Sequence, residues 1–203
     1  MLQIALTNLG KYNEGELCYK WLDLPCSFSD YVDALEEIGI DGVEYEEVFI
    51  SDVNTDIDGL YDKISEYSDV ELLNWLGGKL EEMADWEIEN LEALLENGEH
   101  TDGILEIIEC CDAVSDCDCA MVLSDVDDDE DLGRYWIEES GCYDLSSMGN
   151  LAEYFDYERF GRDVRLEEGG CYTDHGYVVV YGSSWSNYSK DDLPCEYELK
   201  EAF

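Results

Sequence analysis

The sequence has very little positive charge. Its 203 residues include 10 Lys and Arg against 53 Asp and Glu, which leaves a net charge of −43 at pH 7. Solubility requires far less charge than this in a small domain. Such a surface repels nucleic acids and the anionic inner leaflet of a membrane, so direct binding to either is excluded. The charge indicates a cationic partner instead.

Long apolar runs and proline are also scarce. No segment approaches the roughly 18 apolar residues that a membrane span needs, and no basic segment followed by an apolar one marks a secretion signal. With 2 Pro, 45% hydrophobic and 12% aromatic residues, the composition differs from that of disordered acidic tails. We therefore expect a folded, cytoplasmic protein whose nine cysteines remain free thiols.

The amino-terminal part has the pattern of a small β-sheet. Residues 2–9 and 17–24 read as strands, and the polar segment between them suits a hairpin turn. Residues 44–51 read as a third strand, with one acidic face if Glu44 and Glu46 point away from the core. This part of the chain is expected to be mostly β structure.

Helices are expected between and after these strands. Ser27 begins a capping pattern, and Gly39 stands where a helix would end. Leucines recur at helical spacing over 70–95, with an interruption at the Gly77–Gly78 pair, and a further helical stretch spans 104–114. The middle of the chain is therefore predicted to be helical.

The carboxyl-terminal part combines both kinds of element. A strand is expected over 119–126, and the acidic run 127–131 leads into a helix that Gly141 can end. Aromatic and acidic residues alternate over 154–163, and a second strand is expected over 177–181. The last twenty residues look peripheral.

These elements predict an α+β protein with three domains. The expected boundaries are 1–61 for an α+β domain, 62–117 for a helical domain and 118–203 for a second α+β domain. Like charges repel within the Debye length of roughly 8 Å at physiological salt. An elongated body spreads this repulsion over a larger surface, so we expect an elongated shape.

The negative charge is concentrated along most of the chain. Between Trp21 and Gly133 there are 36 acidic residues and two basic ones. Since B-DNA carries one charge per 1.7 Å of axis, −43 corresponds to about 73 Å of duplex. The candidate contact carboxylates are Glu44, Glu46, Glu47, Asp52, Asp56, Asp58, Glu81, Glu82, Asp85, Glu89, Glu92, Glu96, Asp127, Asp128, Asp129, Glu130 and Asp131.

Four segments resemble the ArdA antirestriction family: TNLGKYNEGEL (7–17), WLDLP (21–25), EDLGRYWIEESG (130–141) and YFDYERFGRD (154–163). The resemblance covers roughly residues 1–182. It implies a curved bacterial protein of three domains that dimerises through its carboxyl-terminal domain. It also implies that the protein mimics bent B-DNA and blocks type I restriction-modification enzymes. The family's antirestriction motif falls on 151–163, including Glu153, Asp156, Tyr157, Glu158, Gly161, Arg162 and Asp163.

Two groups of side chains imitate metal sites. Asp127, Asp129, Asp131 and Glu138 have the spacing of calcium-loop ligands, but Leu132 occupies the position of the required glycine. Four cysteines could bind zinc, but they lack a Cys-x-x-Cys pair and a nearby histidine. These are Cys110, Cys111, Cys117 and Cys119. No metal or cofactor is expected.

Two further groups weakly imitate catalytic sites. Asp174 precedes His175, but no nucleophile completes a general-base arrangement. Asp192, Glu198 and Lys200 resemble nuclease residues, yet this surface would repel phosphate at long range. We therefore expect no catalytic residue and no enzyme activity.

Three functions fit an acidic surface of this kind. The first is DNA mimicry directed at a type I restriction-modification enzyme, by a homodimer that binds no nucleic acid itself. The second is an acidic sequestering or scaffold protein for a basic nucleoid partner. The third is an enzyme adapted to high salt, which would need salt to remain folded. The family resemblance favours the first.

Overall fold

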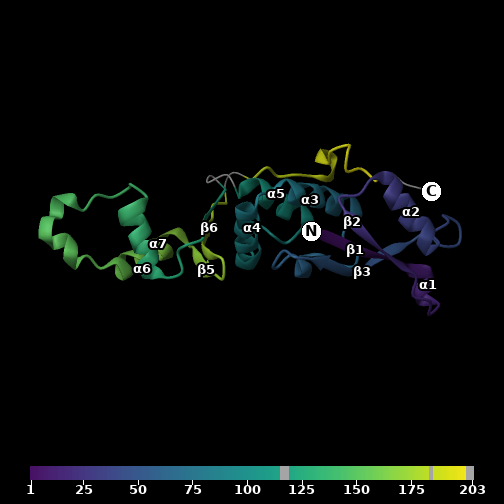
Figure 1. The fold of residues 1–203 in the computed structure, drawn as a ribbon, viewed down its shortest axis with the longest axis horizontal. Helices are drawn as coiled ribbons and strands as arrows, with labels where there is room; N and C mark the ends of the chain where they lie inside the picture. The colour runs from purple at the N-terminus through teal and green to yellow at the C-terminus, as the bar shows by residue number, and fades with distance from the viewer. Residues whose placement is uncertain (115–118, 183–184, 200–203) are drawn as a thin grey trace.

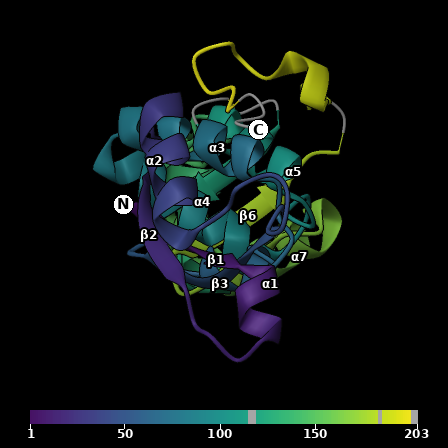
Figure 2. The ribbon, with the colours of Figure 1, turned by 90° about the vertical axis from the view of Figure 1, so that its right-hand side faces the viewer.

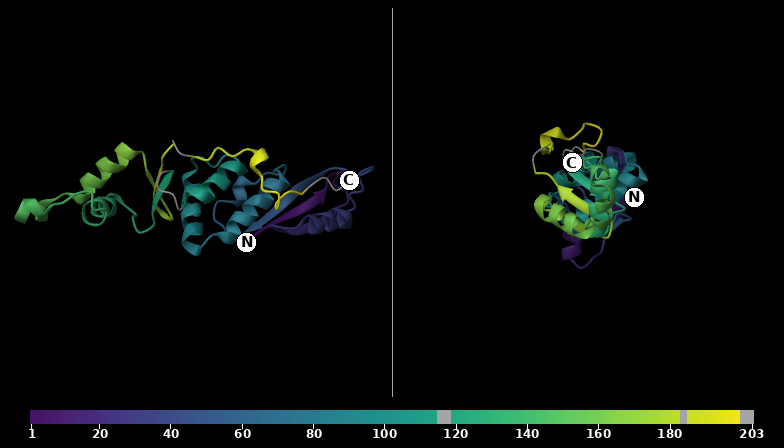
Figure 3. Two further views of the ribbon diagram at one scale, coloured as in Figure 1. Left: turned by 90° about the horizontal axis from the view of Figure 1, so that it is seen from above. Right: turned by 90° about the vertical axis from the view of Figure 1, so that its left-hand side faces the viewer.

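The protein is an elongated α+β molecule. The computed structural model describes residues 1–114, 119–182 and 185–199. In the side view the amino-terminal sheet lies at one end and residues 135–157 lie at the other (Figure 1). Both end-on views show a much smaller cross-section (Figures 2 and 3). The predicted fold class is confirmed, and the described residues form two antiparallel three-stranded sheets with helices.

The first sheet contains β1 (Leu2–Asn8), β2 (Tyr19–Leu24) and β3 (Val48–Thr55) in the order β2-β1-β3. The predicted strands are confirmed for β1 and β2. The expected hairpin turn between them is wrong, because α1 (Leu9–Asn13) occupies the connection. Asn8 caps this helix by accepting a hydrogen bond from the backbone of Lys11 at 2.9 Å.

The strand predicted over 44–51 begins later than expected. The Asp41 carboxylate accepts hydrogen bonds from the backbone N–H groups of Val43, Glu44 and Tyr45 at 2.8–3.0 Å. This turn precedes β3, so Glu44 and Glu46 are exposed loop residues and not one face of a strand. A local side-chain turn competes with strand pairing here.

Four helices cover or extend this sheet: α2 (Phe28–Ile38), α3 (Val70–Glu82), α4 (Asp85–Asn97) and α5 (Ile104–Ala113). The Ser27 capping box with Asp30 and the left-handed Gly39 that ends α2 are both confirmed. A short 3-10 turn, Tyr61–Lys63, follows β3.

The Gly77–Gly78 pair lies inside α3 and does not interrupt it. A Cβ on Gly77 would lie 2.7–2.9 Å from backbone and Cβ atoms of Leu24 and Pro25, closer than normal packing permits. The glycines therefore let α3 approach β2 and the carboxyl-terminal segment. The helix ends at Met83, whose backbone is extended.

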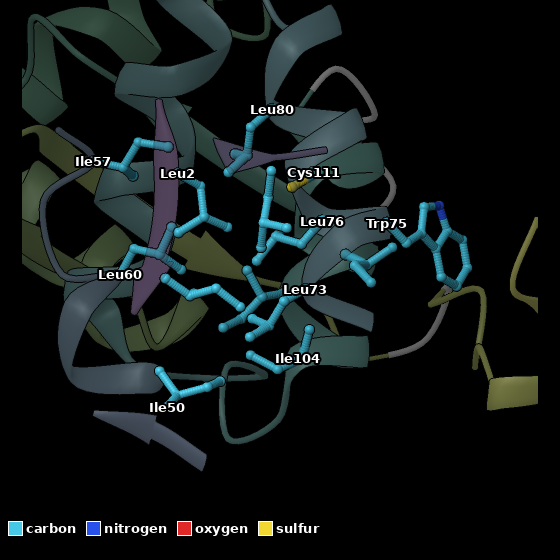
Figure 4. Close-up of a cluster of buried hydrophobic side chains, with 14 of the residues drawn as sticks. Leu2, Ile50, Ile57, Leu60, Leu73, Trp75, Leu76, Leu80, Ile104 and Cys111 are labelled. Carbon is cyan, nitrogen blue, oxygen red and sulfur yellow. The ribbon is translucent and has the colours of Figure 1, made fainter. Parts of the chain in front are cut away.

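One hydrophobic core joins the first sheet to α3, α4 and α5. Figure 4 shows Leu2 of β1, Leu60 of the loop after β3, and Leu73 and Leu76 of α3 together within it. All four are fully or almost fully buried. The core is therefore continuous across residue 61, and the three-domain division remains a prediction.

The second sheet contains β4 (Ala120–Leu123), β5 (Cys171–Thr173) and β6 (Gly176–Val180) in the order β4-β6-β5. Its two faces belong to different cores, since side chains alternate along a strand. Val178 and Ala120 join the core described above, whereas Tyr177 and Val179 join a second, smaller core. The sheet thus separates two halves of the molecule.

Residues 120–182 form the distal half. Beyond the second sheet it contains α6 (Asp129–Arg134), a π-helical turn (Tyr135–Glu139), a 3-10 segment (Ser146–Tyr154) and α7 (Tyr157–Glu168). α6 and α7 pack closely against each other. Residues 1–114 and 185–199 form the proximal half.

The carboxyl-terminal segment 185–199 is not peripheral as predicted. It runs back along α3 and α5, with a 3-10 turn at Lys190–Asp192 (Figure 1). The Tyr188 hydroxyl donates to Asp112 at 2.8 Å, and the Asn74 side chain donates to the Tyr197 carbonyl at 3.2 Å. Trp185, Tyr188, Leu193 and Tyr197 also pack against the main core, so both apolar contacts and hydrogen bonds hold this segment.

Candidate acidic interface

Most of the predicted contact carboxylates lie on the surface. Twelve of them are exposed and form no ion pair with any cation that the structure describes. Two of the twelve, Glu96 and Asp128, accept hydrogen bonds that hold another segment or a helix start, and the other ten do not. We call these ten the open carboxylates: Glu44, Glu46, Glu47, Asp52, Asp58, Glu81, Glu82, Asp85, Glu89 and Asp127. The elements that carry them, from the loop before β3 through α3 and α4 to the loop before α6, follow the long axis of the molecule (Figure 1).

The acidic run before α6 has a structural role instead. Asp128 caps the helix by accepting backbone hydrogen bonds from Glu130 at 2.8 Å and Asp131 at 2.9 Å. Glu130 pairs with Arg134 at 2.7 Å. Asp131 is half-buried in the same helical turn. Of this run, only Asp127 is open for a partner.

Asp129 binds groups of the distal half. It accepts from the Arg165 guanidinium at 2.8 Å and from the Tyr172 hydroxyl at 2.9 Å. The hydrogen bond from Arg165 lowers the pKa of Asp129, while burial raises the pKa of Tyr172. Within the described ranges, no three His, Cys, Asp or Glu side chains are grouped as metal ligands. The calcium-loop spacing around Asp129 therefore forms a helix start and an ion pair.

Three more predicted contact residues also make internal contacts. Asp56 pairs with the amino group of Met1. Glu92 accepts from the backbone of Asp58 at 2.9 Å, and Glu96 accepts from the backbone of Asp174 at 2.8 Å. These contacts orient Glu92 and Glu96 toward neighbouring segments of the same chain.

The predicted antirestriction motif lies in the distal half around the start of α7. Five charged side chains of the motif are exposed: Glu153, Asp156, Glu158, Arg162 and Asp163. Asp156 also caps α7 through the backbone of Arg159 at 3.0 Å. Tyr157 is half-buried, with the Arg134 guanidinium over its ring at 4.6 Å. Its pKa is raised by a hydrogen bond with Glu138.

Gly161 is the buried member of this motif. A Cβ there would overlap the Asp129 carbonyl oxygen and lie 2.7 Å from the Gly133 nitrogen. A Cβ on Gly133 would in turn overlap the backbone of Tyr157. The two glycines let α6 and α7 cross with their backbones in contact. The sequence could have indicated this helix crossing, because a glycine inside a helix is destabilising and usually has a packing role.

A group of apolar side chains is exposed at the distal tip. We call Tyr143, Met148, Leu151 and Tyr154 the tip patch, and Tyr154 is 83% exposed. Behind it, Phe160 packs edge-on against Tyr143 and Phe155, with ring centroids 5.4 and 5.6 Å apart. Neighbouring exposed apolar side chains of this kind favour protein contact.

The remaining candidate sites do not assemble in the described residues. Cys110 and Cys111 are buried in the core, and burial raises the pKa of Cys110 to about 12. Cys117 and Lys200 lie outside the described residues. His175 lies 3.7 Å from Glu92, and Asp192 accepts from the hydroxyl of Ser189. In the described part of the chain no helix is long and apolar enough to cross a membrane.

Comparison with known proteins supports the resemblance seen in the sequence. The model of the family described as antirestriction protein (ArdA) matches residues 4–179. This range contains all four resembling segments, the second sheet except Val180, and the Gly133–Gly161 crossing. A search of curated proteins returned no match. The family match covers most of the chain, and this protein belongs to the ArdA family of antirestriction proteins.

Proposed function

We propose that this protein inhibits type I restriction-modification enzymes by occupying their DNA-binding groove in place of double-stranded DNA. The observation that carries the proposal is the set of open carboxylates along an elongated body. A groove that binds DNA presents Lys and Arg to phosphates, and much of its affinity is electrostatic. Fixed carboxylates offer the same groove a competing anion.

The folded scaffold supports this competition. Glu81, Glu82, Asp85 and Glu89 lie on α3 and α4, which are anchored by the main core. Their positions are fixed in the free protein, so binding to the enzyme does not carry the entropy cost of ordering a chain segment. The negative field also steers encounter, an effect worth roughly 10- to 1,000-fold in association rate.

The direct test is a competition assay at low salt. We expect the protein to prevent both DNA cleavage and methylation by a purified type I enzyme and to release a labelled DNA duplex from it. A histone-like nucleoid protein serves as the control partner. Uninhibited cleavage and methylation with the protein in excess would refute the proposal, and tight binding to the nucleoid protein alone would favour a sequestering role.

We propose that the tip patch joins two copies of the chain in a two-fold symmetric homodimer. Dimerisation through this end would bury Leu151 and Tyr154 and double the length of the charged body. Sedimentation should give a dimer for the wild-type chain and a monomer for Leu151→Glu combined with Tyr154→Glu. A monomeric wild-type chain across micromolar concentrations would contradict this arrangement.

A further inference from the structure

The two halves of the molecule meet where the second sheet packs on α4. The sheet contributes small aliphatic side chains to this contact: Ala120, Val122, Val178 and Val180. Apolar contacts of this kind are non-directional, so they hold the halves together without selecting one angle between them. Directed hydrogen bonds are needed to select an angle.

Such bonds lie at the turn between β5 and β6. The Glu96 carboxylate, which is exposed and next to the last residue of α4, accepts from the backbone N–H of Asp174 at 2.8 Å. The Glu92 carboxylate lies 3.7 Å from Nδ1 of His175. Asn97 also reaches the Cys171 sulfur at 3.1 Å. One helix thus contacts the β5–β6 hairpin turn and the start of β5.

Glu92 connects this turn to the rest of the proximal half. Its second oxygen accepts from the backbone N–H of Asp58 at 2.9 Å, in the loop after β3. The side chain is only 12% exposed, in contrast to the exposed Glu89 of the same helix. Glu92 therefore lies between the loop and the hairpin turn and is poorly placed to reach a partner protein.

We propose that Glu92 and Glu96 are positioning residues, which set the angle between the two halves and make no contact with the restriction enzyme. This inference rests on the proposed function, because the angle decides whether carboxylates on both halves follow one groove. The hairpin turn is the point where carboxylates of α4 contact the distal half. A small rotation there produces a large displacement at the distal tip.

The structural test measures the angle itself. Ketone-bearing amino acids replace the exposed Tyr67 and Leu166, one in each half and both outside the tip patch, and carry a fluorophore pair, so the native cysteines stay unlabelled. An excess of unlabelled chain leaves one labelled copy per dimer. We expect Glu92→Ala combined with Glu96→Ala to broaden and shift the single-molecule transfer distribution, with the far-ultraviolet circular dichroism unchanged.

The matched control is Glu92→Gln combined with Glu96→Gln. It removes the same two charges, but each amide oxygen can still accept the backbone hydrogen bond. This variant should keep the wild-type distribution. The milder Glu96→Ala variant gives a second reading if the double alanine variant does not fold. An unchanged distribution in every folded alanine variant would overturn the proposal.

Inhibition provides the functional test. The alanine pair should require about fivefold more protein than the glutamine pair for half-inhibition, a size typical of residues that act on coupling from outside a site. If the double alanine and double glutamine variants lost inhibition equally and kept the wild-type transfer distribution, Glu92 and Glu96 would be contact carboxylates instead. If the wild-type chain does not inhibit the enzyme, the proposed function fails. The fluorescence result still decides whether Glu92 and Glu96 set the angle between the two halves.

Discussion

Gly161→Ala should destabilise the protein by about 3 kcal/mol, at the upper end of ordinary overpacking costs, and should remove inhibition as the distal half unfolds. Alanine normally favours a helix over glycine by about 1 kcal/mol. Here the new Cβ would overlap the Asp129 carbonyl and approach the Gly133 backbone. The two helix backbones cannot move apart without losing the packing of Leu132 and Tyr177 behind them. The clash therefore outweighs the gain in helix propensity, and the substitution is destabilising.

Chemical denaturation checks this expectation, with hydrogen exchange reporting where the loss occurs. Amides of α6 and α7 should exchange much faster in the variant, while those of β1 and α3 change little. Gly182→Ala is the matched control, because a Cβ there meets no atom within 4 Å. A Gly161→Ala chain as stable as the control would show that the helices do not cross at this glycine.

Neutralising the carboxylates of α3 and α4 should weaken inhibition by roughly 10- to 100-fold at low salt, within the range of electrostatic steering. The variant carries Glu81→Gln, Glu82→Gln, Asp85→Asn and Glu89→Gln. All four wild-type side chains are open carboxylates, so no described ion pair is lost. Relief of like-charge repulsion should leave the thermal midpoint equal or higher.

The half-inhibitory concentration for cleavage measures this effect. A control with Glu81→Asp, Glu82→Asp and Glu89→Asp keeps every charge and shortens the side chains. It should inhibit nearly as well as the wild type, since a long-range field depends on charge more than on reach. Equal potency of the neutralised variant and the wild type would show that these helices do not face the enzyme.

Local signals in the sequence predicted the elements that depend on local contacts. Ser27, Asp30 and Gly39 mark the ends of α2 within a few residues, and the structure confirms both caps. The helix interruption predicted at the Gly77–Gly78 pair is wrong, because these glycines make room for Leu24, Pro25 and Tyr197, which are distant in sequence. The path of residues 185–199 depends on hydrogen bonds to α3 and α5 and on irregularly spaced apolar side chains such as Trp185 and Tyr188, which form no helical or strand period.

The candidate interface was predictable in kind but not residue by residue. Composition alone indicates an acidic surface, and twelve of the seventeen predicted carboxylates are indeed exposed without a described ion pair. Asp129 and Arg165 lie 36 residues apart, and Glu96 and Asp174 lie 78 apart. Only the fold brings these groups together. A carboxylate that holds its own chain looks the same in sequence as one that meets a partner.

Displacement of DNA from a type I enzyme, followed as the salt concentration rises, tests the central claim most directly. A fluorescent duplex bound to the enzyme reports release through its anisotropy. DNA mimicry predicts full, competitive release by this protein at low salt, with an affinity that falls steeply as NaCl screens the carboxylates. A stable complex containing enzyme, DNA and this protein together, or an affinity that does not change with salt, would contradict it.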